Sequence, residues 1–356
     1  MVEKIKKVYE LLSDEISKEI FLNRLLYNVT TEQGYCEKMY EHLLTDKSVR
    51  KIAEEFCNLI GNRAVVIYGI GDRGQRFYRN IRACMPLVEI VAFCDKKHNV
   101  ERVFEGVPVI SVKEYVEEYK DCMLIVSPKN YQNEIKDNIV SNGGIEENVL
   151  LYESSPILLD VLWSVSHNQY FDDFIKFTKD EIFVDGGCFD CATSFEFANR
   201  CPDYKEIIAF EPDKNNYEIC IKKAAQTSLE NITIYNYGLW DSHTTLSFVE
   251  EGTESRVTDD GLISIETETI DTVLKEKKVT FIKMDIEGAE LNALMGARET
   301  IVKCRPKLAI SIYHKLNDIV EIPLYINSLV SGYKFYIRHY DTCTFETVFY
   351  AIPNDY

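Results

Sequence analysis

Apolar residues follow three different patterns along the chain. Over residues 1–60 they recur at helical spacing, for example at Ile5 and Leu12, which predicts several helices. Thr30–Thr31 and Gly34 are the expected breaks between these helices. This N-terminal helical segment holds no catalytic set of residues, so we expect it to pack against other structure or to form a homodimer.

From residue 61 to residue 151, short apolar runs alternate with helical stretches. The run RAVVIYG begins at Arg63 and precedes a glycine loop, and further runs follow at 88–94, 108–110 and 122–127. Strands that alternate with helices predict a doubly wound, mainly parallel sheet. We therefore expect a Rossmann-like domain here, followed by a linker over 152–178 that is helical near 156–165.

A second alternating series occupies residues 179–356. Its strands are expected at 182–185, 206–210, 232–237, 279–284 and 308–313, with final runs at 333–339 and 344–351. The last two runs follow each other without a helix, which requires an antiparallel pair. Alternating residues in TTLSFV (244–249) and LISIET (262–267) predict a hairpin-like insertion. The predicted fold class is α/β, with two Rossmann-like units behind a helical segment.

Composition narrows the class of protein. The 356 residues include 40 Lys+Arg and 58 Asp+Glu, a net charge of −18, and 46% of them are hydrophobic. This apolar content excludes a disordered chain, and the negative field argues against nucleic acid or an anionic membrane as partner. No apolar stretch is long enough to span a membrane. Eleven scattered cysteines, behind an N-terminus without an apolar core, favour a cytoplasmic protein with reduced thiols.

The first glycine loop reads Gly69-Ile70-Gly71-Asp72-Arg73-Gly74 and lies between a predicted strand and a predicted helix, with Asp95 at the end of the next strand. This spacing matches the dinucleotide fingerprint, in which amides at a helix start bind a pyrophosphate and the acid binds ribose hydroxyls. Two interpretations stay open. The loop binds a nucleotide, either a sugar nucleotide or an NAD-like ligand, or it is a structural turn.

The second glycine loop has a different character. Asp185 precedes Gly186 and Gly187, Ser194 follows, and the next strand ends in Glu211. Two carboxylates beside a cofactor crevice would repel a pyrophosphate. They suit a ligand with ribose hydroxyls, an ammonium group and a sulfonium, which describes S-adenosylmethionine.

Six motifs in order carry a family resemblance: VDGG…S, IIAFEPD, YNYGLWD, TIDTVL, FIKMDIEGAE and LAISIYHK. Over roughly residues 180–352 the chain resembles the FkbM family of S-adenosylmethionine-dependent methyltransferases. The resemblance implies a class I methyltransferase fold with a seven-stranded sheet and an antiparallel last strand. It also implies methyl transfer to a hydroxyl of a sugar or a natural product.

The resemblance implies roles for individual residues as well. Asp185 and Gly187, with their neighbours Gly186 and Ser194, belong to the cofactor loop, and Glu211 binds the ribose. Gly238, Leu239 and Trp240 border the adenine, and Asp285 and Glu287 lie beside the methyl-transfer centre. One residue departs from the family pattern, because Cys191 stands where a second loop glycine is usual. Its Cβ is tolerated if φ is negative but crowds the approach of the cofactor.

A sugar hydroxyl needs a base before it attacks a methyl group. His314, after the fifth strand of the second series, is the best candidate. Asp285 or Glu287 would orient the hydroxyl or support His314, and Lys283 is expected to form an ion pair with these acids. A variant in which Asp285, Glu287 and His314 hold Mg²⁺ ranks below direct base catalysis.

Cys188 and Cys191 form a C-x-x-C pair inside the second loop. A redox role needs a thioredoxin-like context and zinc needs further ligands, so no metal site is predicted. The leading hypothesis is an O-methyltransferase acting on a saccharide or a nucleotide-linked sugar. The alternatives are an NAD- or sugar-nucleotide-dependent enzyme centred on Gly69–Gly74, and a non-catalytic binding protein.

Overall fold

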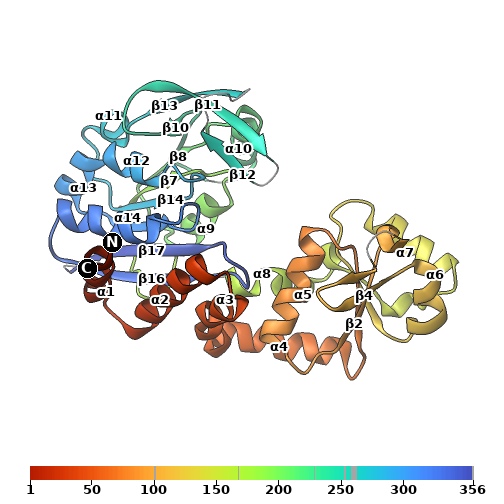
Figure 1. Ribbon diagram of the computed structural model, residues 1–356. Helices are drawn as coiled ribbons and strands as arrows, with labels where there is room; N and C mark the ends of the chain where they lie inside the picture. Colours follow the sequence, from red (N-terminus) through yellow and green to blue (C-terminus); the bar gives the residue numbers. More distant parts are fainter. Residues whose placement is uncertain (100–101, 167, 228, 252–253, 258–262, 355–356) are drawn as a thin grey trace. The chain divides into compact units, whose positions relative to one another are not determined.

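The computed structural model describes residues 1–99, 102–166, 168–227, 229–251, 254–257 and 263–354. It divides into two compact units (Figure 1). The large unit combines residues 1–39 with residues 168–356, and the small unit comprises residues 40–167. Among the described residues, no helix combines the length and apolar content of a bilayer span.

The small unit is built on a six-stranded sheet in the order β3-β4-β2-β1-β5-β6. Its strands are β1 (Val65–Tyr68), β2 (Ile90–Cys94), β3 (Val103–Phe104), β4 (Val107–Ile110), β5 (Met123–Val126) and β6 (Val149–Leu151). All neighbours pair in parallel except β3 and β4, which form an antiparallel hairpin. This sheet agrees with the predicted alternation of strands and helices, to which it adds β3 and β6.

Helices contribute to a core on each face of this sheet. They are α4 (Lys47–Ile60), α5 (Asp72–Cys84), α6 (Val112–Glu114), α7 (Gln132–Ser141) and α8 (Pro156–Trp163). Phe56, Phe77 and Leu158 belong to one core, and Tyr115 and Ile139 belong to the other. Helix α8 lies within the segment expected as a linker, and its apolar side chains complete the core of the small unit.

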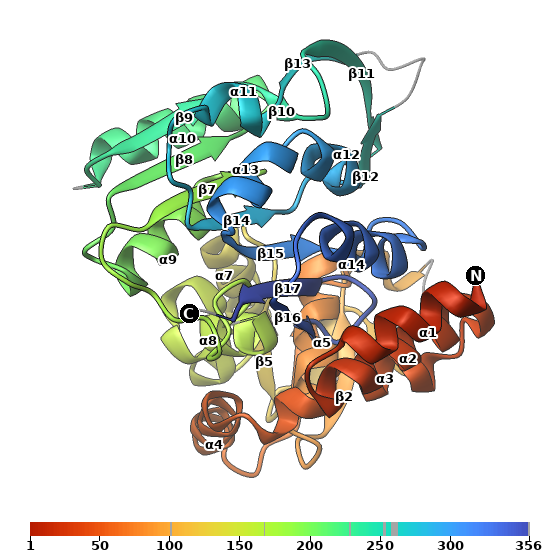
Figure 2. The same cartoon turned by 90° about the vertical axis from the view of Figure 1, so that its left-hand side faces the viewer.

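The large unit has a seven-stranded sheet in the order β16-β17-β15-β14-β7-β8-β9, which Figure 2 shows from β9 to β16. Its strands are β7 (Ile182–Gly186), β8 (Glu206–Phe210), β9 (Ile232–Tyr235), β14 (Phe281–Met284), β15 (Lys307–Ser311), β16 (Tyr333–His339) and β17 (Thr347–Pro353). Strand β17 pairs antiparallel with both β15 and β16. The predicted seven strands and antiparallel last strand are therefore confirmed.

Residues that alternate along β7 face two different cores. Ile182 and Val184 belong to the main hydrophobic core together with residues of α11 (Ile270–Leu274), α12 (Glu290–Met295), α13 (Arg298–Cys304) and α14 (Asp318–Leu329). Phe183 points the other way and stacks on Phe197 of α9 (Ala192–Arg200), with 4.4 Å between ring centroids. Helix α10 (Lys214–Gln226) follows β8.

A second, four-stranded sheet forms the predicted insertion, in the order β10-β13-β11-β12. Its strands are β10 (Gly238–Leu239), β11 (Thr244–Glu251), β12 (Glu254–Val257) and β13 (Ile263–Glu268). Strands β11 and β13 pair antiparallel, as the alternating runs predict. Leu262, the first residue of the second predicted run, lies outside the described residues.

The N-terminal helices α1 (Val2–Leu11), α2 (Glu15–Thr30) and α3 (Gln33–Tyr40) pack with the large unit. The predicted break at Thr30–Thr31 is confirmed, since Thr31 has φ +58° at the end of α2. The predicted break at Gly34 is wrong. Gly34 lies in the first turn of α3, where backbone N–H groups need no partner within the helix.

Helix α2 covers the edge strand β16, beside which it lies in Figure 1, and helix α1 packs against α14. The backbone N–H of Ser13 donates to the carbonyl of Phe335 over 2.8 Å. The N–H groups of Phe335 and Ile337 donate in turn to the hydroxyls of Ser13 and Ser17, over 3.0 and 2.9 Å. An unpaired strand edge is thereby satisfied by the beginning of the chain.

A buried ion pair links β15 to the segment before β7. The Nζ of Lys307 lies 2.6 Å from Oε1 of Glu181, and both side chains are fully buried. Replacing Lys307 with Met should lower the free energy of unfolding by about 3–5 kcal/mol, because Glu181 keeps a buried charge without its partner. A urea titration followed by circular dichroism measures this loss.

The matched control for Lys307→Met is the double variant with Glu181→Gln, which removes the second charge and keeps an acceptor for the N–H of Thr178. The double variant should recover roughly half of the loss or more. A Lys307→Met protein within about 1 kcal/mol of wild type would contradict the prediction.

Candidate active site

Three predicted acids and the predicted base, His314, lie at the carboxyl ends of four adjacent strands. Asp185 lies in β7, Glu211 follows β8, Asp285 follows β14, and His314 lies shortly after β15. The strand order runs outward in both directions from the β7–β14 pair. Open α/β sheets bind their ligands in the crevice at such a switch point.

Asp185 and Lys283 form a buried ion pair across this switch point. Their Oδ1 and Nζ atoms lie 3.0 Å apart, and Lys283 also donates to the carbonyls of Gly186 and Gly187 over 3.2 and 2.8 Å. The hydroxyl of Ser194 donates to the other carboxylate oxygen of Asp185 over 2.7 Å. Lys283 therefore forms an ion pair, but its partner is Asp185 and not Asp285 or Glu287, which the sequence analysis expected. Asp185 stabilises the loop through this pair and through Ser194.

The two loop glycines are required by close packing. A Cβ on Gly187, where φ is +72°, would lie 2.0 Å from the carbonyl oxygen of Asp285. A Cβ on Gly186 would lie 2.9 Å from the side chain of Leu239. The glycines therefore bring the loops after β7 and β14 into direct contact.

Glu211 holds the same loop from the neighbouring strand. Its carboxylate oxygens accept from the backbone N–H groups of Phe189, over 2.8 Å, and Asp213, over 2.9 Å. Burial raises the pKa of Glu211 to about 7, although both hydrogen bonds oppose this shift. The side chain is 5% exposed, at the end of β8 where a ribose is expected.

The residues expected beside the adenine are distributed around the start of the four-stranded sheet. Leu239 is buried next to Gly186, and Gly238 pairs with Thr267 of β13. Trp240 is half-buried, and its carbonyl oxygen lies so close to Gly296 that a Cβ on Gly296 would be 2.1 Å from it. Leu239 is the member of this group that packs against the cofactor loop.

Asp285 accepts hydrogen bonds from two tyrosines that the sequence analysis did not assign to the site. The hydroxyl of Tyr170 donates to Oδ2 over 2.7 Å, and the hydroxyl of Tyr313 donates to Oδ1 over 3.1 Å. Burial alone would raise the pKa of Asp285, but the charges of Lys283 and His314 outweigh it and lower this pKa. Asp285 is therefore an ionised carboxylate with a fixed orientation.

His314 lies among three carboxylates. Its Nδ1 is 3.0 Å from Glu290, and its Nε2 is 3.5 Å from Asp285 and 3.4 Å from Glu287. Burial alone would lower the pKa of His314, but Glu290 and the two other acids outweigh it and raise the pKa to about 9. The ring is an imidazolium at neutral pH, which a simple base assignment did not anticipate.

The predicted partner Glu287 and the unpredicted partner Glu290 differ in exposure. The Glu287 side chain is 46% exposed and φ at this residue is +55°, whereas Glu290 is fully buried. Ligand atoms of Asp285, Glu290 and His314 all lie within 4.8 Å of one another. A divalent cation would therefore be held by Glu290 in place of the Glu287 expected from the sequence.

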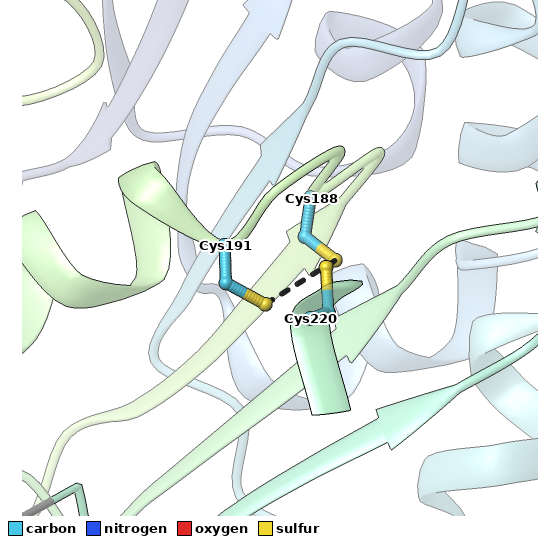
Figure 3. Close-up of side chains that lie close together, drawn as sticks. All are labelled: Cys188, Cys191 and Cys220. Atoms are coloured by element: carbon cyan, nitrogen blue, oxygen red, sulfur yellow. Dashed lines mark hydrogen bonds between the residues drawn. The ribbon is translucent and has the colours of Figure 1, made fainter. Parts of the chain in front are cut away.

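Three buried thiols meet under the cofactor loop, and we call Cys188, Cys191 and Cys220 the thiol cluster (Figure 3). The Sγ atom of Cys188 lies 3.7 Å from that of Cys220 and 3.8 Å from that of Cys191. Hydrogen bonds from the other two thiols lower the pKa of Cys220. The backbone of Cys191 has φ +64°, so the negative φ that would accommodate its Cβ without strain is not present.

The first glycine loop, in the small unit, is held by its own residues. Asp95 accepts from the backbone N–H of Ile70 over 3.0 Å and from that of Lys97 over 2.8 Å. A Cβ on Gly74 would lie 1.9 Å from the carbonyl oxygen of Gly69. Gly69 itself has φ +97°, which favours glycine. Packing thus explains Gly69 and Gly74, whereas a Cβ on Gly71 would meet open space.

Comparisons with known proteins agree with this geometry. Residues 184–335 match the family model described as the methyltransferase FkbM domain, and residues 61–151 match the one described as C2185-like, N-terminal. The crystal structure of methyltransferase FkbM from Methylobacillus flagellatus KT is similar with a TM-score of 0.50 and 19% identity, over 95% of this chain and 99% of that one. No curated protein matches.

Two further solved structures are similar to about half of the chain. An rRNA methylase from Streptococcus thermophilus has 15% identity and a TM-score of 0.34, covering 49% of this chain and 89% of its own. A putative methyltransferase from Streptococcus mutans in complex with SAH has 12% identity and a TM-score of 0.32, with the same two coverages. At such TM-scores neither carries a structural argument.

The large unit has the fold and the acid-lined strand ends of S-adenosylmethionine-dependent methyltransferases. Within it, residues 184–335 match the FkbM methyltransferase domain, and the fold is similar to that of the FkbM methyltransferase structure. The resemblance inferred from the six motifs is therefore confirmed for this part of the chain.

The elevated pKa of His314 predicts a pH-dependent contribution to stability. The folded-state value of about 9 exceeds the ordinary 6.5, so the imidazolium stabilises the fold fully below about pH 6.5 and loses this effect as the pH rises through about 9. The difference in unfolding free energy between wild type and His314→Gln should shrink by about 3 kcal/mol between these limits.

An NMR titration of the histidine ring protons supplies the matching measurement. One resonance with a midpoint near 9 should be present in wild type and missing in His314→Gln. A His314 midpoint near the ordinary value of 6.5 would contradict the prediction.

Proposed function

We propose that the large unit binds S-adenosylmethionine at the carboxyl ends of β7 and β8 and transfers its methyl group to a hydroxyl of a saccharide or a nucleotide-linked sugar. The observation that carries this proposal is the convergence of Asp185, Glu211 and Asp285 on adjacent strand ends around a glycine loop. Because Lys283 neutralises Asp185, the ionised Asp285 is the carboxylate that favours a cationic sulfonium over a pyrophosphate in this site.

Each cofactor residue has its own proposed role, either in contact with the cofactor or in holding the loop. Gly187 lets the loop after β7 approach Asp285, Glu211 accepts from the ribose hydroxyls, and Leu239 and Trp240 border the adenine. The Asp185–Lys283 pair and Ser194 hold the loop without touching the cofactor. Asp285 faces the sulfonium, with both of its oxygens oriented by tyrosine hydroxyls.

Methyl transfer forms an O–CH₃ bond as the S–CH₃ bond breaks, and the hydroxyl proton needs an acceptor. We assign this role to His314 in its neutral form. Arrival of the positive sulfonium beside Asp285 weakens the carboxylate support of the imidazolium, which lowers the pKa of His314 from about 9 and releases its proton. The more exposed Glu287 would orient the acceptor hydroxyl.

S-adenosylhomocysteine at a hundred times its Kd should add about 2.7 kcal/mol to the free energy of unfolding, and the melting temperature of the protein should rise accordingly. Glu211→Ala should weaken its affinity at least about tenfold, because the ribose hydroxyls lose a buried hydrogen-bond acceptor. Isothermal calorimetry measures both affinities.

The matched control is Glu206→Ala, at the opposite end of β8, where the side chain pairs with Lys277. It should leave the affinity unchanged. Glu211→Gln, which keeps an acceptor for the N–H of Phe189, separates loss of ribose binding from collapse of the loop. Unchanged affinity in Glu211→Ala would defeat the assignment of Glu211.

The small unit would recognise the acceptor through its nucleotide portion. The free space above Gly71, at the start of α5 where no side chain caps the helix, supports a phosphate site on this loop. Asp95 is engaged with backbone amides, so the ribose contact expected from the sequence stays a proposal. The cytoplasmic location and a homodimer through the N-terminal helices are proposals as well.

Uridine diphosphate sugars should stabilise the protein and accept label from methyl-labelled S-adenosylmethionine, whereas the free sugars should react less. Gly71→Val should abolish the stabilisation, because its side chain fills the phosphate position without a clash in the fold. The small-unit fold, followed by circular dichroism, is the control. Equal labelling of free and nucleotide-linked sugars in both proteins would refute the role of this loop.

A further inference from the structure

The thiol cluster is the strongest feature that the proposed methyl transfer does not use. Cys188, Cys191 and Cys220 are 3%, 0% and 0% exposed, and with Ala209 they make up the buried residues of a small separate cluster. Figure 3 shows their side chains converging from the loop after β7, the start of α9 and the middle of α10. The sequence supplies a C-x-x-C pair without further ligands, and the fold supplies the third thiol.

We propose that Cys188, Cys191 and Cys220 bind one thiophilic metal ion, Zn²⁺, that fastens the β7–α9 loop to α10. The proposal does not depend on methyl transfer, because it concerns a site outside the acid-lined crevice. The fourth ligand is a water molecule or the carbonyl oxygen of Phe189, which lies 3.2 Å from the Sγ of Cys220.

The distances between the thiols match a metal site. Zinc bonds to thiolate sulfur at about 2.3 Å in tetrahedral geometry, which places any two sulfur ligands about 3.8 Å apart. The two separations in the cluster are 3.7 and 3.8 Å. The third thiol pair, Cys191 and Cys220, has its sulfur atoms within 4.8 Å of each other, so a small movement of one side chain brings all three into the geometry of a zinc site.

The backbone at Cys191 favours a ligand role over simple packing. A residue with a Cβ at φ +64° costs about 1–2 kcal/mol that glycine avoids. Replacing this thiol with glycine would remove the strain, yet the side chain stands here and directs its Sγ at Cys188. Strain retained at one position points to a function of the side chain that causes it.

Charge and position are compatible with a bound ion. Binding Zn²⁺ releases the three thiol protons to solvent and leaves a net charge of minus one on the ion with its three thiolates. The cluster lies at the N-terminus of α9, whose positive end favours a negative group. The covering loop reaches the surface, since Phe189 is 65% exposed.

Titration of the reduced, metal-free full chain with Co²⁺ tests the proposal. We expect one equivalent to bind, with thiolate-to-cobalt charge-transfer absorption in the near ultraviolet, and Zn²⁺ to displace it. Cys220→Ala should weaken binding at least about tenfold and reduce the band, because one of three ligands is lost. Cys201→Ala, a buried cysteine outside the cluster, is the matched control.

Cys191→Gly keeps the test valid if Cys220→Ala does not fold. Glycine suits the left-handed backbone at this position, so the metal-free variant should be at least as stable as the metal-free wild type and still show a reduced cobalt band. A reduced wild-type chain without the band, or equal bands in wild type and Cys191→Gly, would overturn the proposal. Loss of two of the eleven thiols to a disulfide within the cluster, without bound zinc, would overturn it as well.

Discussion

The buried ion pair of Lys283 with Asp185 is the interaction on which the rest of the large unit depends. Neither charge is tolerable alone in a position with almost no exposure, because removing one partner leaves the other desolvated and uncompensated. Ser194 and the carbonyls of Gly186 and Gly187 complete the coordination of both groups. The pair joins β7 and β14, the two strands from which the strand order runs outward in opposite directions. It therefore lies where the crevice of the sheet opens.

Periodicity predicted the sheet of the large unit well, because buried parallel strands are continuous apolar runs that end in polar residues. The antiparallel end of the sheet followed from the missing helix between the last two runs. Short elements were harder to predict. Strand β6 has three residues and β3 has two, so neither shows a period, and both depend on the neighbours with which they pair.

At the N-terminus, the break at Asp14 was available in principle, since its side chain caps α2 by accepting from the N–H of Ser17. The packing of these helices against β16 could not be predicted from the sequence. Serine hydroxyls that complete the edge of β16 have no signature in the sequence, because their partners lie more than three hundred positions away.

The positions of candidate site residues were predictable where motifs lie at strand ends, as for Asp185, Glu211 and Asp285. Contacts between distant segments were not. Tyr170 reaches Asp285 from the segment before β7, and Glu290, although it stands in a recognised motif, is identified as a partner of His314 by distance alone. The charge state of His314 likewise follows from three acids that converge only in the folded chain.

The hydrogen bonds of Ser13 and Ser17 with β16, more than three hundred positions later in the chain, have a consequence for synthesis. The first helices leave the ribosome long before β16 is synthesised, so their apolar faces have no native partner during that time. The small unit can complete its own core in the same interval. Until the last strands emerge, the N-terminal helices lack much of the core into which they pack in the folded chain.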